Sequence, residues 1–83
     1  MNKYECEEIL LKANKLIGNK VIITRGHSPK FKHKINCRLL KVACLCFKES
    51  GGKEMCQPKA FLEDTTNGEH FTWPLDLVLS ENN

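Results

Sequence analysis

The segment at residues 35–47, INCRLLKVACLCF, constrains the fold more than any other part of the chain. It is long for a β-strand, and adjacent apolar residues at 39–40 and 43–47 place apolar side chains on both of its faces. A strand of this kind usually bends, so that its two ends face different parts of a core. The segment therefore predicts a strongly curved sheet or a small barrel.

The first part of the chain predicts one amphipathic helix over residues 2–17. Asn2 can cap it, and Glu5 stands three residues later, as in a capping box. Gly18 is a typical helix stop. The apolar residues recur at three- and four-residue spacing and so share one face: Cys6, Ile9, Leu10, Ala13, Leu16 and Ile17.

Shorter segments on both sides of 35–47 predict four more strands. The first strand of the chain, residues 20–25, is rich in β-branched residues. The Asn67-Gly68 turn indicates a hairpin between the third strand, residues 59–64, and the fourth, residues 69–73. Pro74 ends the fourth strand, and a single helical turn precedes the fifth. These segments are residues 20–25, 59–64, 69–73 and 77–80.

One helix followed by five strands predicts a mainly β single domain, with the helix at 1–18 and a small closed barrel at 19–83. GNKVIITRG with its basic loop, then AFLED, a turn and HFTWPLDLVL, resembles the SH3-like barrel superfamily over about residues 18–80. Within it, the Tudor and KOW types are the most similar. The resemblance implies a binding module rather than an enzyme, because relatives bind RNA, DNA, ribosomes, transcription complexes or methylated tails.

Charge is strongly segregated along the chain. Residues 9–48 carry +10 without one acidic residue, the first eight carry −2, and residues 49–83 carry −5, giving a net charge of +3. Such a basic segment favours a polyanionic partner. One alternative is a solvated loop that binds nothing, and another is an acidic protein surface as the partner.

The loop after the first strand is the centre of this basic segment. In an extended chain Lys30, Lys32 and Lys34 would point one way. Phe31 and His33 would point the other way, where they could stack on a base. The predicted binding set, for nucleic acid or for an acidic protein, is Lys20, Arg25, Lys30, Phe31, Lys32, His33, Lys34, Arg38 and Lys41.

The five cysteines are an odd number, which argues against a disulfide framework and favours reduced thiols. A zinc set of Cys37, Cys44, Cys46 and Cys56, with His33 or His70 as a further ligand, is the alternative. Its C-x-C spacing is unlike the usual C-x-x-C zinc knuckle. We therefore expect no metal and no other cofactor.

The aromatic residues Phe61, Phe71 and Trp73 are typical of a core. An alternative is a cage for a methylated lysine, as in Tudor relatives, with Glu63, Asp64 or Asp76 supplying an acidic partner.

No residue pattern indicates catalysis, since the neighbours His27 and Ser28 do not make a catalytic arrangement. The polar N-terminus is unlike a signal peptide, and no apolar run is long enough to span a bilayer. We therefore expect a cytoplasmic, non-catalytic module that binds nucleic acid or a ribonucleoprotein or transcription machine, without a membrane or a small-molecule substrate. The alternative is a small protein-binding regulator or inhibitor, such as a phage protein that blocks a host enzyme or defence system.

Overall fold

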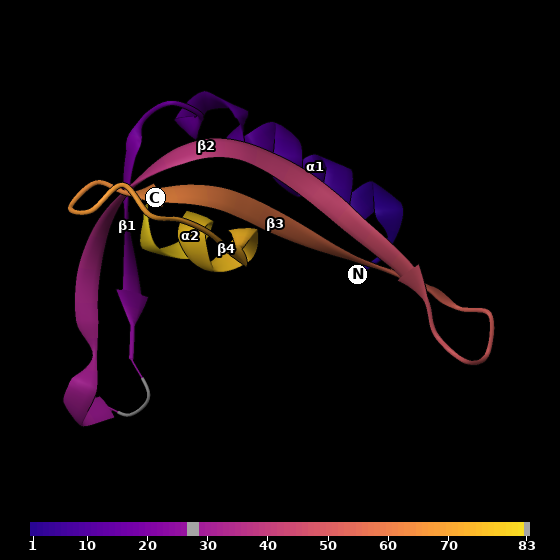
Figure 1. The fold of residues 1–83 in the computed structure, drawn as a ribbon. Helices are drawn as coiled ribbons and strands as arrows, with labels where there is room; N and C mark the ends of the chain where they lie inside the picture. Colours follow the sequence, from indigo (N-terminus) through magenta and orange to yellow (C-terminus); the bar gives the residue numbers. More distant parts are fainter. Residues whose placement is uncertain (27–28, 83) are drawn as a thin grey trace.

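The computed structural model describes residues 1–26 and 29–82, so the predicted pair His27 and Ser28 lies outside the described residues. Over this part of the chain, a four-stranded antiparallel meander curls into a half-barrel (Figure 1). The order of the strands in the sheet is their order in the sequence. The elements are α1 (Lys3–Ala13), η1 (Asn14–Leu16), β1 (Lys20–Arg25), η2 (Pro29–Phe31), β2 (His33–Lys48), β3 (Glu54–Asp64), β4 (His70–Pro74) and α2 (Leu75–Glu81).

The predicted N-terminal helix is confirmed as α1 and the short 3₁₀ turn η1 that follows it. The Asn2 side chain accepts a hydrogen bond from the Glu5 amide at 2.8 Å and donates one to the Glu5 carboxylate at 2.9 Å. These two bonds close the N-terminal turn, since helix termini leave amide groups without partners. Over the described residues, neither helix is long and apolar enough to cross a membrane.

The bend predicted in the long strand is confirmed in β2. Its pairing with β3 shifts register between Leu39 and Lys41, so Leu40 is an extra residue at a β-bulge. Beyond the bulge, β2 and β3 continue as a long hairpin that projects away from the rest of the molecule, at the lower right of Figure 1. We call the part of this hairpin formed by residues 43–59 the hairpin arm.

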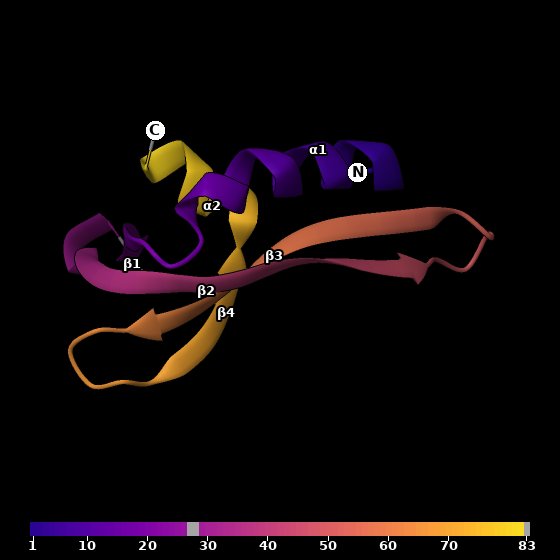
Figure 2. The same cartoon turned by 90° about the horizontal axis from the view of Figure 1, so that it is seen from above.

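The core lies between one face of the sheet and the two helices, which lie on the same side of it (Figure 2). We call this the inner face of the sheet and the opposite one the outer face. The completely buried side chains of the core include Ala13 from α1, Val21 and Ile23 from β1, Cys37 and Leu39 from β2, Ala60 and Leu62 from β3, and Leu75 and Val78 from α2.

The predicted closed barrel of five strands is wrong. The sheet has four strands in the described residues, and residues 77–80 belong to α2 instead of forming a fifth strand. Leu75 and Val78 are spaced three residues apart and both are completely buried, whereas Leu77 is exposed. A helix places residues three apart on one face, whereas a strand would have buried Leu75 and Leu77 together. Burial against the sheet therefore selects the helix.

The side chain of Asn82, which follows α2, fixes the end of this helix to the free edge of β1. The Ile22 amide donates to Asn82 Oδ1 at 2.8 Å, and Asn82 Nδ2 donates to the Ile22 carbonyl at 2.9 Å and to the Val78 carbonyl at 2.8 Å. The Asn82 amide therefore pairs with Ile22 as the backbone of a neighbouring strand would, which protects an edge that could otherwise recruit another chain.

Replacing Asn82 by alanine is expected to expose the Ile22 amide and to lower the free energy of unfolding by about 1 kcal/mol, the usual net value of hydrogen bonds of this kind. Hydrogen exchange followed by NMR should show faster exchange at Ile22. Ser80→Ala is the control, because the Ser80 hydroxyl bonds only within α2, to the Leu77 carbonyl. Equal Ile22 exchange in both variants would contradict this role for Asn82.

Candidate nucleic-acid interface

The outer face of the sheet carries a group of basic side chains, which we call the basic sheet face. Side chains alternate between the two faces along each strand, and the register shows which residues share a face. Neither helix covers the outer face (Figure 2). Its basic residues are Lys20 from β1, Lys34, Arg38 and Lys41 from β2, and Lys59 from β3.

One row of basic and acidic residues, which ends in a histidine, crosses all four strands of the outer face. The register aligns Lys20 with Arg38, Arg38 with Glu63, and Glu63 with His70. Among the strand residues that point outward, all of which the structure describes, Glu63 is the only acid. The Oε2 atom of Glu63 lies 3.2 Å from His70 Nε2, so this carboxylate oxygen already has a hydrogen-bond partner. The outer face is therefore strongly positive, with a single compensating charge near β4.

An aromatic ring lies within the basic sheet face. Lys41 Nζ lies 4.6 Å from the centroid of the Phe61 ring, which is a cation–π distance. Beside this pair is a shallow hollow of about 340 Å³, bordered by the side chains of Leu40, His70 and Thr72. Phe61 thus places an aromatic ring next to an exposed cation, a combination that suits base stacking.

The predicted alternation of side chains in the basic loop is wrong, because residues 29–31 form the 3₁₀ turn η2 rather than an extended chain. Lys30, Phe31 and Lys32 are exposed around this turn, and Phe31 is 72% exposed. We call residues 30–32 the hairpin tip. A Cβ atom on Gly26 would lie 2.5 Å from the Phe31 carbonyl oxygen, so the close fold-back of the tip requires glycine there.

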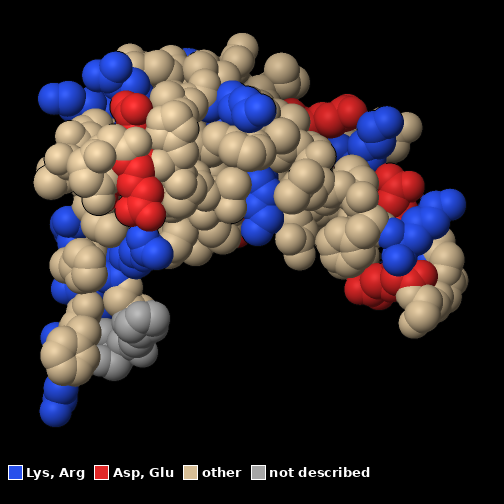
Figure 3. Space-filling model, in the orientation of Figure 1, with Lys and Arg blue, Asp and Glu red and all other residues tan. Residues whose placement is uncertain are grey.

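Two of the hairpins, β1–β2 and β2–β3, differ in charge. In Figure 3 the β1–β2 hairpin, which ends in the hairpin tip at the lower left, shows basic side chains and no acidic ones on the face that is drawn. The hairpin arm at the lower right shows both signs. On the face that is drawn, the β1–β2 hairpin is therefore basic, whereas the hairpin arm carries mixed charge.

Two residues of the predicted set, Arg25 and His33, lie on the inner face. They border an open groove of about 1020 Å³. Asp64 and Glu69 also line this groove, so its charge is mixed, and the Arg25 guanidinium lies 5.5 Å from the centroid of the Phe71 ring. The structure thus divides the predicted set into three groups. Lys20, Lys34, Arg38 and Lys41 lie on the outer face, and Lys30, Phe31 and Lys32 lie at the hairpin tip. Arg25 and His33 lie on the inner face.

The sequence-based set omitted Lys59 and Phe61 from this surface. Lys59 pairs with Ala43, and Phe61 pairs with Lys41, so both share the outer face with the basic residues of β2. Only the register of β2 against β3 could have indicated this, and the bulge at Leu40 sets that register.

The alternative of an aromatic cage is not supported by the arrangement of the rings. Phe71 and Trp73 lie edge to face on the inner side, with their ring centroids 6.3 Å apart. Phe61 lies on the outer face, because it pairs with Thr72 and Lys41. The three rings are therefore separated by the sheet itself, and they do not surround a common space.

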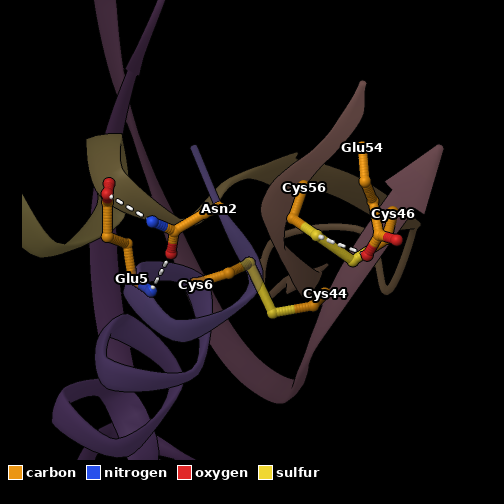
Figure 4. The surroundings of a disulfide bond; sticks show 7 residues. All are labelled: Asn2, Glu5, Cys6, Cys44, Cys46, Glu54 and Cys56. Atoms are coloured by element: carbon orange, nitrogen blue, oxygen red, sulfur yellow. Dashed lines mark hydrogen bonds between the residues drawn. A yellow bond between two sulfur atoms is a disulfide. The ribbon is translucent and has the colours of Figure 1, made fainter. Parts of the chain in front are cut away.

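The prediction of five reduced thiols differs from the structure, which joins Cys6 to Cys44 and Cys46 to Cys56 in disulfides (Figure 4). Cys37 is a free thiol in the core, and burial raises its pKa, with a further contribution from the Asp64 carboxylate. Seven residues of extended chain, roughly 20 Å, separate Cys37 from Cys44. Cys37 therefore cannot belong to the predicted zinc set.

Comparison with protein-family models, with curated proteins and with solved structures finds no match to this chain. The geometry described above is therefore the basis for the functional proposal.

Proposed function

We propose that this protein is a non-catalytic, cytoplasmic module that binds nucleic acid through the basic sheet face. The observation that carries the proposal is the basic sheet face itself: five basic side chains on one uncovered face, opposed by Glu63 as the single outward-pointing acid of the described strands. Lysine and arginine near a phosphate backbone displace condensed counterions, which gives affinity independent of sequence.

The aromatic residues favour a single-stranded segment over a duplex. Phe61 lies among the basic residues of the outer face, and Phe31 is exposed at the hairpin tip. A basic surface with interspersed rings binds single strands by pairing with phosphates and stacking on bases, since every base presents a flat face. A rigid duplex would leave both rings without a role.

One observation favours a second candidate, the regulator that docks on an acidic protein surface. Leu45 and Phe47 point outward from the hairpin arm and are 51% and 46% exposed. Exposed apolar side chains beside charged ones are typical of protein interfaces, in which they form the buried centre. On this reading the basic residues steer the partner, and the hairpin arm supplies the contact area.

Salt-dependent titration of a labelled single-stranded oligonucleotide, followed by fluorescence anisotropy, tests the proposal. Replacing Lys34 and Arg38 together by alanine is expected to weaken binding of every sequence and to lower the slope of log K against log salt by about two, because each phosphate contact contributes about one. Both residues are exposed, so the melting temperature should change little.

Lys12→Ala with Lys15→Ala is the matched control. It removes the same charge from the helical side of the molecule, where both lysines are exposed. An equal loss of slope in the two double variants would show that binding does not use the outer face. If the wild type shows no binding at physiological salt, and a nuclease-treated pull-down retains a stoichiometric protein that is lost in a Phe47→Ala variant, the regulator is the correct function.

A further inference from the structure

A single acidic side chain stands in the basic sheet face, and the binding of phosphates gives it no role. Glu63 is the one outward-pointing acid of the described strands, and its side chain is 33% exposed. A carboxylate repels a phosphate backbone, so at this position it opposes the affinity that the basic side chains provide. A carboxylate does accept hydrogen bonds from the N–H groups of bases. Glu63 is therefore better suited to contact with a base than with a phosphate.

The hydrogen bonds of Glu63 leave part of its carboxylate available. Oε2 lies 3.2 Å from His70 Nε2, and because an ionised carboxylate can only accept, Nε2 carries the proton of this bond. Arg38 lies opposite Glu63 in the register, but the ion pairs of residues 1–26 and 29–82 do not include one between them. Over the same residues, Oε1 accepts no hydrogen bond. His70 thus orients the carboxylate, and Oε1 is free to accept from a ligand.

The hollow beside Phe61 lies next to this carboxylate. Phe61 precedes Glu63 by two residues on β3, so the two side chains share the outer face about 7 Å apart. Their partners on β4, Thr72 and His70, border the hollow. Its volume of about 340 Å³ is large enough for one nucleobase, and its walls are mainly apolar. A flat ring that carries donors on its edge can therefore fill the hollow and reach Glu63 at the same time.

We propose that the hollow beside Phe61 is a guanine-binding subsite of the basic sheet face, in which Glu63 reads the base. This inference rests on the proposed binding of a single strand, in which the Watson–Crick edge of each base is free. The base stacks on the Phe61 ring. Guanine presents two adjacent donors on that edge, N1–H and N2–H, and the two oxygens of the Glu63 carboxylate accept them. Each oxygen has two lone pairs, so the bond from His70 to Oε2 is kept.

The other bases do not match a carboxylate in this position. Adenine N1 and cytosine N3 are acceptors beside the amino group, so each would face a second acceptor. Uracil has one donor, N3–H, between two carbonyl oxygens. Bidentate contacts discriminate between bases by about fivefold or more. The carboxylate therefore selects guanine over the other three bases.

Lys41 connects the subsite to the binding of the backbone. Its Nζ atom lies 4.6 Å from the centroid of the Phe61 ring. The flexible stem of a lysine allows this cation to pair with the phosphate next to a base that stacks on the ring. Affinity from phosphates and preference from Glu63 thus come from separate groups, so the two can be measured separately.

Fluorescence anisotropy with four labelled oligouridines of equal length tests the subsite. One contains uridine alone, and the others carry a single central guanosine, adenosine or cytidine. The wild-type protein is expected to bind the guanosine-containing strand at least about fivefold more tightly than the other three. Glu63→Gln should lose this preference, because an amide offers one acceptor and one donor in place of two acceptors.

Two further variants separate the base contact from the phosphate contacts. Lys34→Ala is the matched control, because Lys34 is exposed on the outer face and does not border the hollow. It should lower the affinity for all four strands by the same factor and keep the preference. Phe61→Leu keeps an apolar side chain but removes the ring, so it should lower the affinity for the guanosine-containing strand by at least about fivefold. Circular dichroism checks that each variant is folded.

The outcomes separate this inference from the proposed function. Equal binding of all four strands by the wild type, weakened by Lys34→Ala, would overturn the guanine subsite and leave the binding of single strands intact. A guanine preference that persists in Glu63→Gln would show that another group reads the base and would refute the assignment. Absence of binding to every strand would overturn both proposals.

Discussion

Replacing Leu62 by alanine is expected to lower the free energy of unfolding by about 3–5 kcal/mol, the range typical of buried leucines that leave a cavity. Leu62 is completely buried in β3, between Leu39 of β2 and Phe71 of β4 in the register. The free energy of unfolding of a chain of 83 residues is only about 4–12 kcal/mol. This single cavity would therefore remove a large part of it.

Urea unfolding followed by circular dichroism measures this loss. Leu11→Ala is the control, because Leu11 is 74% exposed on α1, and its replacement should change stability by less than about 0.5 kcal/mol. If Leu62→Ala cost no more than Leu11→Ala, the core would not lie between the inner face and the helices.

Removal of the Cys6–Cys44 disulfide is expected to lower the stability of the oxidised, metal-free protein by about 4 kcal/mol. The bond closes a loop with a sequence separation of 38 residues, whereas the separation in Cys46–Cys56 is 10. In the chain-entropy model, the loss grows with the logarithm of loop length and comes to about 3.9 kcal/mol for the longer loop and about 2.7 kcal/mol for the shorter one.

The comparison uses two double variants, Cys6→Ala with Cys44→Ala and Cys46→Ala with Cys56→Ala, each unfolded by urea in the presence of a chelator. The first pair should be the less stable, because its disulfide closes the longer loop and is the one of the two disulfides that joins α1 to the hairpin arm. A greater loss in the second pair would mean that strain or packing, rather than loop closure, determines the contribution of each bond.

Local patterns were sufficient to predict most of the secondary structure. The β-branched run predicts β1 at its observed bounds, Lys20–Arg25, and the Asn67-Gly68 turn lies between β3 and β4 as expected. The C-terminal segment was ambiguous because Leu75, Leu77 and Leu79 alternate, as in a strand, while Leu75 and Val78 have helical spacing. Only contacts with the sheet decide between the two, and a short segment carries too little local preference to decide alone.

The binding surface was harder to predict than the fold. A shift of one residue in the pairing of β2 with β3 would move Lys59 and Phe61 to the other face, and the bulge that sets this register is not visible in the sequence. The pairing of Cys6 with Cys44 likewise depends on how α1 packs against β2. Such long-range contacts follow from the complete fold, whereas the segregation of charge along the chain was apparent at once.

The meander has a consequence for the order in which the chain acquires its structure. Each strand pairs with the next one in the sequence, so the hairpins can form one after another without closing a long loop, which favours rapid folding. The helix α1 precedes the whole sheet in the sequence, yet the surfaces that bury it belong to β2, β3 and α2. Docking of α1 therefore depends on segments that come later in the chain, and we expect it to follow the formation of the β2–β3 hairpin.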